Sequence, residues 1–256
     1  MLGKLLKYEY KATMRTFIPI YIALLLVALV NRIFRIGNIE IGFGISAFGL
    51  VLLFMALGVI TIMVIIQRFN GNLLGDEGYL MFTLPVNSSS LIISKIIMSI
   101  VWTICSGIVA FMTFLVLVGT KEDILDFISN IDVIWAKMVV DFTVNGEQVN
   151  PISTILFIVV IMLFMYIMFI LKIYLSLAIA QLPAVCKHRG IIAFVAFFVI
   201  NTITTILTSI LGQIIPEHFF QSFIGGAITI NGYLFILCMI YFIGTKFILD
   251  KHLNLE

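Results

Sequence analysis

The chain has 256 residues, of which 62% are hydrophobic and only 11% are charged. A soluble domain contains about 45–50% apolar and about 25% charged residues, and a soluble fold of this length could not bury so much apolar surface. This apolar excess predicts an all-α integral membrane protein. The formal net charge of +2 gives no information about nucleic acid, but the sequence has no basic tract of the kind that nucleic-acid binding needs, so no nucleic-acid partner is expected.

The first residues form a basic stripe that is not typical of a secretory signal. Lys4, Lys7, Lys11 and Arg15 fall on one side of a helix, and leucines fall on the other side. Cations of this kind face anionic lipid headgroups. The pattern predicts an amphipathic helix over residues 1–16 that lies in the membrane interface.

Glu9 interrupts this pattern, because it falls within the apolar face of the predicted helix. Two explanations remain open. Either this end of the helix is better hydrated than the pattern implies, or Glu9 pairs with a cation on a neighbouring helix or subunit.

Six segments are long and apolar enough to cross the membrane, which takes roughly 20 residues for a hydrocarbon core of about 30 Å. The first is the weakest, because Asn31, Arg32 and Arg35 interrupt its far end. The predicted spans are residues 17–34, 45–67, 96–118, 152–180, 191–211 and 227–248.

Small residues open the second span. Gly42, Gly44, Ser46 and Gly49 follow one another at short intervals, and this spacing is typical of helices that approach a neighbour closely. We therefore expect close helix contact there.

Lysines and arginines place both termini in the cytoplasm. With the N-terminus inside, four of the 15 cations fall on outer segments (Arg32, Arg35, Lys121 and Lys137), which leaves eleven on inner ones. Lys172 lies near the inner end of the fourth span, and we expect it to snorkel toward the interface.

The segment 68–95 joins the second and third spans and would lie in the cytoplasm. Asp76 and Glu77 lie at its centre, beside a group of apolar side chains. Such a group favours insertion into a partner's groove, and the alternative is a surface-lying or re-entrant segment that only joins two helices. The turn-forming residues are Gly71, Gly75, Gly78 and Pro85, and the apolar side chains are Tyr79, Leu80, Met81, Phe82 and Leu84.

The outer segment 119–150 predicts an amphipathic helix on the membrane surface. Apolar residues recur at helical spacing from Ile124 to Phe142, and Trp135 would lie among the headgroups. We interpret its aspartates as a solvated face, with a binding site as the alternative.

The fifth span carries an unusual number of hydroxyl and amide groups. Asn201, Thr205 and Thr208 lie along one side of the predicted helix. They either pack helices together or line a path for a substrate.

Reactive groups are nearly absent from the centres of the spans. No HExxH, GxSxG or GxxxxGK[ST] motif occurs. Cys105 and Cys238 are expected to act as small apolar residues, and Cys186 forms no CxxC pair. The sequence predicts a non-catalytic chain with no cofactor and no metal.

The stretch GDEGYLMFTLPV (75–86), followed by Ser94 and Lys95, resembles the loop of ABC-2 type transporter permeases, especially a group common in Gram-positive bacteria. The opening LGKLLKYEYKAT (2–13) resembles the start of the same group. The six-span layout and the length also fit, so the resemblance covers essentially the whole chain.

This resemblance implies one ABC-2 transmembrane domain over residues 1–256, of the type V exporter-like architecture, in the plasma membrane of a bacterium. Two such permease subunits, identical or different, would pair with two separate ATP-binding cassette ATPase subunits. The chain would export a peptide, lipid or drug-like substrate, and the partner would hydrolyse the ATP.

The resemblance also assigns roles to residues. Segment 1–16 would be the elbow helix, with Lys4, Lys7, Glu9, Lys11 and Arg15. Segment 68–95 would hold the coupling helix. There Asp76 and Glu77 would make polar contacts to the ATPase, Tyr79, Leu80 and Phe82 would form the apolar plug, and Gly78 and Pro85 would shape the turn.

Three other functions remain as alternatives. The first is a carrier or channel that works without an ATPase. The second is an intramembrane enzyme. The third is a peptide-immunity or sensor protein that transports no substrate. No candidate nucleophile or base supports the enzyme.

Overall fold

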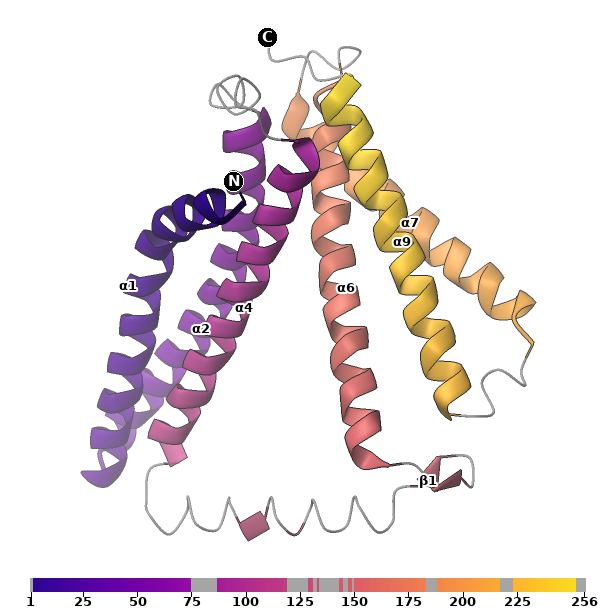
Figure 1. Cartoon of the computed structure of the whole chain (residues 1–256). Coiled ribbons are helices and arrows are strands. Elements are labelled where there is room, and N and C mark those ends of the chain that lie inside the picture. The colour runs from indigo at the N-terminus through magenta and orange to yellow at the C-terminus, as the bar shows by residue number, and fades with distance from the viewer. Residues whose placement is uncertain are drawn as a thin grey trace. The chain divides into compact units, whose positions relative to one another are not determined.

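The computed structural model describes residues 2–74, 87–118, 129–130, 133, 143–144, 147–148, 150–182, 188–216 and 223–251. Long helices dominate this part of the chain (Figure 1). They are α1 (Leu2–Ile36), α2 (Glu40–Phe69), α4 (Ser88–Val118), α6 (Pro151–Ile179), α7 (Arg189–Ile214) and α9 (Phe223–Lys251). A short π-helix, η1 (Asn70–Leu74), directly follows α2.

All six of these helices are long and apolar enough to span a membrane, which confirms the predicted number of spans. They contain between 26 and 35 residues, more than the roughly 20 that a bilayer core requires. By length and composition the chain is therefore a multi-pass membrane protein whose helices extend past the hydrocarbon core or tilt within it.

The interfacial helix expected at residues 1–16 forms the beginning of α1, which continues without a break to Ile36. Figure 1 shows the indigo start of α1 bending away from the rest of the helix. Two features favour this bend. Pro19 has no N–H to donate to the carbonyl of Arg15, and the Thr13 hydroxyl donates to the carbonyl of Glu9 at 2.7 Å.

The helices divide between two compact units. The first comprises Met1–Arg68 and Ser89–Asp132, and so contains α1 and nearly all of α2 and α4. The second comprises Phe69–Ser88 and Val133–Glu256, and so contains η1, α6, α7 and α9.

The core of the first unit lies between faces of α1, α2 and α4. Its residues recur at intervals of four or seven positions along each helix, and such intervals place side chains on one face. The buried members are Phe17, Leu24 and Ala28 of α1, Leu50, Leu57 and Val64 of α2, and Met98 and Trp102 of α4.

The polar residues that weaken the first predicted span are accommodated by hydrogen bonds. Asn31 is buried, and its Nδ2 donates to the Ser46 hydroxyl at 2.8 Å and to the Phe43 carbonyl at 3.2 Å. Arg35 donates to the carbonyl of Leu117 at 3.1 Å. This carbonyl lies near the C-terminal end of α4, where a positive charge interacts favourably with the helix dipole.

Close helix contact at the start of α2 is confirmed at Gly42. A Cβ atom on Gly42 would lie only 2.8 Å from Cγ of the Phe34 ring. Gly44, in contrast, has nothing within 4 Å of that position. A larger residue would therefore collide with a neighbouring side chain at Gly42 but not at Gly44.

In the second unit α6 packs against both α9 and α7. Between α7 and α9 the hydroxyls of Thr204 and Tyr241 are 2.7 Å apart, and both residues are buried. At the end of α2, Phe69 stacks on Tyr174 of α6 with ring centroids 4.1 Å apart. Cys238 is buried and Cys105 is half-buried, and both are free thiols inside helices, as expected.

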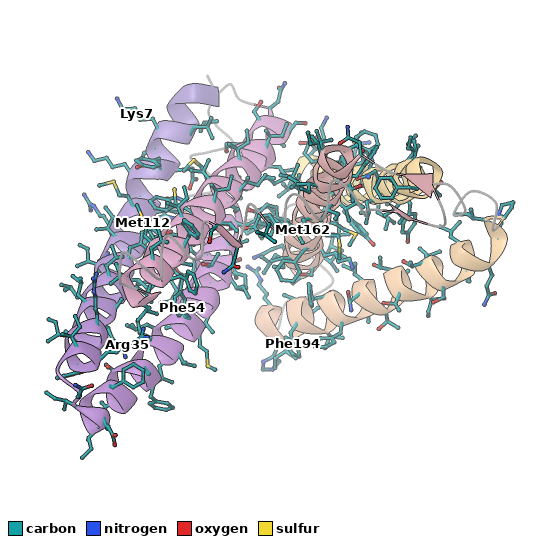
Figure 2. All side chains as sticks on the ribbon, turned by 90° about the horizontal axis from the view of Figure 1, so that it is seen from below. Lys7, Arg35, Phe54, Met112, Met162 and Phe194 are labelled. Atoms are coloured by element: carbon teal, nitrogen blue, oxygen red, sulfur yellow. The ribbon has the colours of Figure 1, made fainter. Side chains whose placement is uncertain are left out.

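Large apolar side chains cover the outside of every spanning helix. Met162 and Phe194, labelled in Figure 2, are each 65% exposed. Phe54 and Met112 of the first unit are also exposed. Such surfaces suit contact with lipid rather than water.

In the segment expected to form an outer amphipathic helix, Ser129, Asn130 and Val133 are helical. The structure adds a feature that was not expected. Strand β1 (Thr143–Val144) pairs antiparallel with β2 (Glu147–Gln148), shortly before α6 begins. The remainder of the expected helix lies outside the described residues.

Candidate functional site

A buried ion pair joins the start of α1 to the start of α4. Lys95 Nζ lies 2.8 Å from Glu9 Oε1, and their side chains are only 3% and 6% exposed. Glu9 therefore pairs with a cation on a neighbouring helix, which confirms one of the two explanations for its position in an apolar face. A buried charge is tolerated when it is paired in this way.

Trp102, two helical turns after Lys95 on α4, makes a second contact with α1. Its indole Nε1 donates to the Thr13 hydroxyl at 2.6 Å. Its ring stacks between Tyr10 and Phe17, with centroid distances of 5.3 and 4.8 Å. Further along the same helices, the Tyr21 hydroxyl lies 2.8 Å from Ser106 Oγ.

We name Glu9, Thr13, Lys95 and Trp102 the α1–α4 clamp. On α1 the two members are four residues apart, and on α4 they are seven apart, so each pair lies on one face of its helix. A buried ion pair beside a directional hydrogen bond fixes the register of two helices more strictly than apolar packing does. Its two polar contacts, the ion pair and the hydrogen bond from Trp102 to Thr13, connect α1 to α4.

The clamp lies immediately after the segment that resembles a coupling loop. Helix α4 begins at Ser88, so the last part of the expected loop 68–95 is helical and Lys95 lies in the second to third turn of α4. The Ser88 hydroxyl donates to the Asp250 carboxylate near the end of α9. The loop residues Asp76, Glu77, Gly78, Tyr79, Leu80, Phe82 and Pro85 lie outside the described residues.

The basic stripe of the expected elbow helix is found on the exposed side of α1. Lys7, Lys11 and Arg15 are exposed, and Glu9 on the other side is buried. The side chain of Lys4 lies outside the described residues. This distribution matches the amphipathic pattern, although the helix continues into the first span.

The three path residues predicted on the fifth span are exposed on α7. Asn201 Oδ1 accepts a hydrogen bond from Lys172 of α6 at 3.1 Å. Thr205 donates to the Asn201 carbonyl at 3.0 Å, and the hydroxyls of Thr208 and Tyr233 are 2.8 Å apart. They therefore form one polar side of α7, which contacts both α6 and α9.

The expectation that Lys172 snorkels to the interface is wrong. Lys172 is 5% exposed, and its ammonium points to Asn201, within the α6–α7 contact. Asn201 lies twelve residues into α7, and its amide provides an acceptor within the span, so the lysine reaches sideways to α7.

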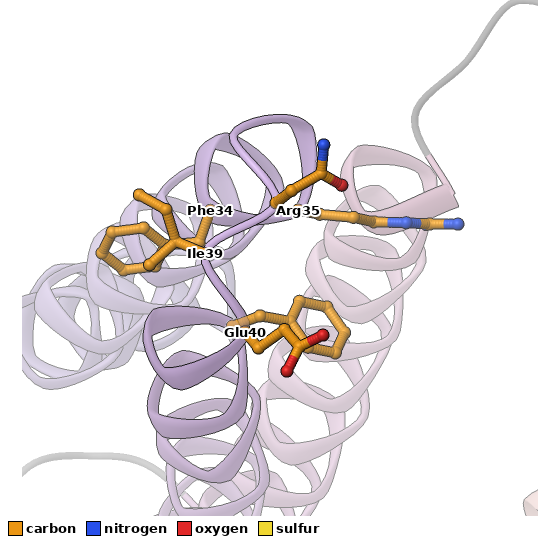
Figure 3. A pocket seen from close by; sticks show the side chains of 6 residues that line it. Phe34, Arg35, Ile39 and Glu40 are labelled. Carbon is orange, nitrogen blue, oxygen red and sulfur yellow. The ribbon is translucent and has the colours of Figure 1, made fainter.

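Two pockets lie within the described residues of single units. One, of about 280 Å³, lies at the α1–α2 turn and is shown in Figure 3. Asn38 in this turn has a φ of 52°, a left-handed conformation that asparagine tolerates. The side chains of Arg35 and Glu40 line it together with apolar groups.

The second pocket, of about 300 Å³, lies between η1, the end of α6 and the start of α7. Gln181 on its wall is buried, and its Oε1 has no hydrogen-bond partner among the described residues. Because this oxygen is itself shielded, it does not present an acceptor to the pocket. The lining residues are Asn70, Gly71, Leu74, Leu177, Ala180, Gln181, Arg189, Gly190 and Ala193.

Sequence reasoning missed Thr13 and Trp102 of the clamp. The signal was present in α1, where Glu9, Thr13 and Phe17 recur every four residues and therefore share one face. Their partners on α4 are set by tertiary packing, which no local period encodes.

No protein-family model, no curated protein and no solved structure matches the chain.

Proposed function

We propose that the chain is the membrane-spanning permease subunit of an ABC-2 type ATP-binding cassette transporter, and that it exports its substrate. ATP is hydrolysed by separate ATPase subunits, and a second permease subunit completes the membrane part. The single observation that carries the proposal is the α1–α4 clamp, which attaches the basic N-terminal segment to the helix that leaves the coupling-like loop.

The number of spans supports a position for this loop on the side of the termini. Six crossings return the chain to the side on which it started, and segment 75–86 follows the second crossing. The excess of lysine and arginine on that side supports a cytoplasmic location for it. An ATPase in the cytoplasm would thus have access to the loop and to the exposed stripe of α1.

The clamp gives a physical route for transmitting force. A partner that pushes on segment 75–86 displaces the start of α4. Because Glu9 and Lys95 are buried together, separating them leaves an unpaired buried charge at a cost of about 3–5 kcal/mol. The start of α1 therefore moves with α4, and the bend in α1 converts this displacement into a tilt of the first span.

The proposal is tested by reversing two charges in the loop. The double variant Asp76→Lys, Glu77→Lys is expected to remain in the membrane and to lose co-purification with an ATP-binding cassette ATPase, identified by mass spectrometry. Glu40→Lys is the control, because Glu40 is exposed at the other end of α2. Equal recovery of the ATPase with all three proteins would contradict the proposal.

Transport without a partner separates this function from an ATPase-independent carrier. The purified chain alone in sealed vesicles is expected to move no substrate, because it has no phosphate-binding motif of its own. Sustained transport by that preparation would favour the carrier.

A further inference from the structure

Two lysines are buried inside the described helices, and their surroundings differ. Lys95 is paired with the Glu9 carboxylate at 2.8 Å. Lys172 is equally buried, yet its hydrogen-bond partner in the described part of the chain is the neutral Asn201 Oδ1 at 3.1 Å. In the part of the chain that the structure describes, Lys172 therefore has no anionic partner of the kind that Lys95 has.

An ammonium group carries three N–H donors and no acceptor. When Lys172 is protonated, one neutral acceptor leaves two donors and the positive charge without a compensating group among the described residues, which is costly in a low-dielectric region. Ionisable groups at such positions in membrane helices are usually part of a site. Within the described residues, the component that Lys172 lacks is an anion.

The hydrogen bond from Lys172 also fixes the orientation of the Asn201 side chain. Because lysine can only donate, the amide oxygen of Asn201 must face Nζ. The amide nitrogen then points away from Lys172. Asn201 is exposed, so this second donor is available on the exposed side of α7.

The surface around Asn201 is both polar and apolar. The hydroxyl-bearing residues Thr202 and Thr205 lie within one turn and are exposed. Phe198 and Ile203 flank them and are 53% and 51% exposed. A ligand that satisfies both kinds of surface has an anionic headgroup and hydrocarbon chains.

From this geometry we propose that Lys172 and Asn201 bind the phosphate of an anionic phospholipid, whose acyl chains cover the exposed apolar side chains of α7. Phosphate supplies several acceptor oxygens, which suit the ammonium and the amide donor together. Binding of the lipid does not depend on an ATPase. The further statement that the bound lipid is the exported substrate rests on the proposed function.

The test measures lipids retained by the full chain. The protein is purified from nanodiscs that contain phosphatidylglycerol and phosphatidylcholine in equal amounts, and native mass spectrometry counts the lipids that stay bound. We expect a preference for phosphatidylglycerol that falls about tenfold in Lys172→Met, the effect of losing one charge-assisted hydrogen bond. Lys172→Arg is expected to keep the preference, and Lys246→Met is the control.

A second variant distinguishes loss of the site from loss of the fold. Asn201→Asp supplies an internal carboxylate next to Lys172 without changing the size of the side chain. It is expected to abolish the preference for phosphatidylglycerol and to raise the melting temperature of the protein. A melting temperature that rises while the lipid preference persists would overturn the proposal.

Two further results would overturn it. One is the same lipid preference in the wild type and in Lys172→Met. The other is complete displacement of the lipid by millimolar inorganic phosphate, which would show that the site binds a bare anion. Neither result depends on the ATPase, so this proposal and the proposed function can fail separately.

Discussion

Several buried polar side chains among the described residues are held by partners on neighbouring helices. Glu9 meets Lys95, Asn31 meets Ser46 and Thr204 meets Tyr241. Helices in a membrane gain little from apolar contact with each other, because lipid is equally apolar. The polar pairs therefore select which faces pack together and in which register.

Removing one partner of the clamp is expected to destabilise the protein. Lys95→Met leaves the Glu9 carboxylate buried without its cation, and should lower the free energy of unfolding by about 3 kcal/mol. A denaturant titration in mixed micelles measures this value.

Two controls accompany this variant. Lys7→Met removes an exposed cation from the same helix and should change stability by less than about 0.5 kcal/mol. The exchanged pair Glu9→Lys, Lys95→Glu should recover part of the loss. A loss of stability in Lys7→Met as large as that in Lys95→Met would refute the role of the pair.

Two glycines at the start of α2 provide a matched test of close packing. Gly42→Ala places Cβ 2.8 Å from the Phe34 ring and is expected to cost about 1–3 kcal/mol. Gly44→Ala meets nothing within 4 Å, and should be neutral or slightly stabilising because alanine is the better helix former. Thermal unfolding of both variants measures the difference, and equal melting temperatures would contradict the close contact.

At the scale of the helices, the spans could be predicted from the sequence and their ends could not. Hydropathy identifies the part of a helix that lies in hydrocarbon. It does not show that residues 88–95 continue α4 toward the loop, or that residues 2–16 continue into the first span. No glycine or pair of breakers separates that segment from Phe17, so the helix persists through Pro19 with a bend.

Hydropathy also does not reveal the partner of Glu9 in the α1–α4 clamp or the pairing of β1 with β2. The position of Glu9 in an apolar face left a cationic partner as one of two explanations, and the sequence offers 15 lysines and arginines, from which tertiary packing selects Lys95. Strands β1 and β2 flank Asn145 and Gly146, and an Asn-Gly pair is a strong hairpin signal in sequence.

The bend in α1 can be measured as a distance between its ends. Tyr8 and Ile33 are both exposed on α1, and spin labels there would lie about 37 Å apart along a straight helix with a rise of about 1.5 Å per residue. We expect a shorter distance in the wild type and an increase toward the straight value in Pro19→Ala, because alanine restores the missing N–H. An unchanged distance would show that Pro19 does not set the bend.

At the scale of the whole molecule, six crossings place the segments before and after α4 on opposite sides of the membrane. With Cys105, Cys186 and Cys238 replaced, a single cysteine at Asn87 should react with an impermeant maleimide only from the cytoplasmic side. A cysteine at Asn145 should react only from the opposite side. Reaction of both from one side would contradict the six-span topology.

The most direct test of the central claim places a photo-crosslinking residue in the coupling-like loop. Replacing Tyr79 with benzoylphenylalanine in cells is expected to give, on irradiation, a covalent adduct with an ATP-binding cassette ATPase. The same residue at Ile41, which is exposed at the other end of α2, should give no such adduct. If Tyr79 crosslinks only to lipid or to the chain itself, the claim that this loop receives force from an ATPase is wrong.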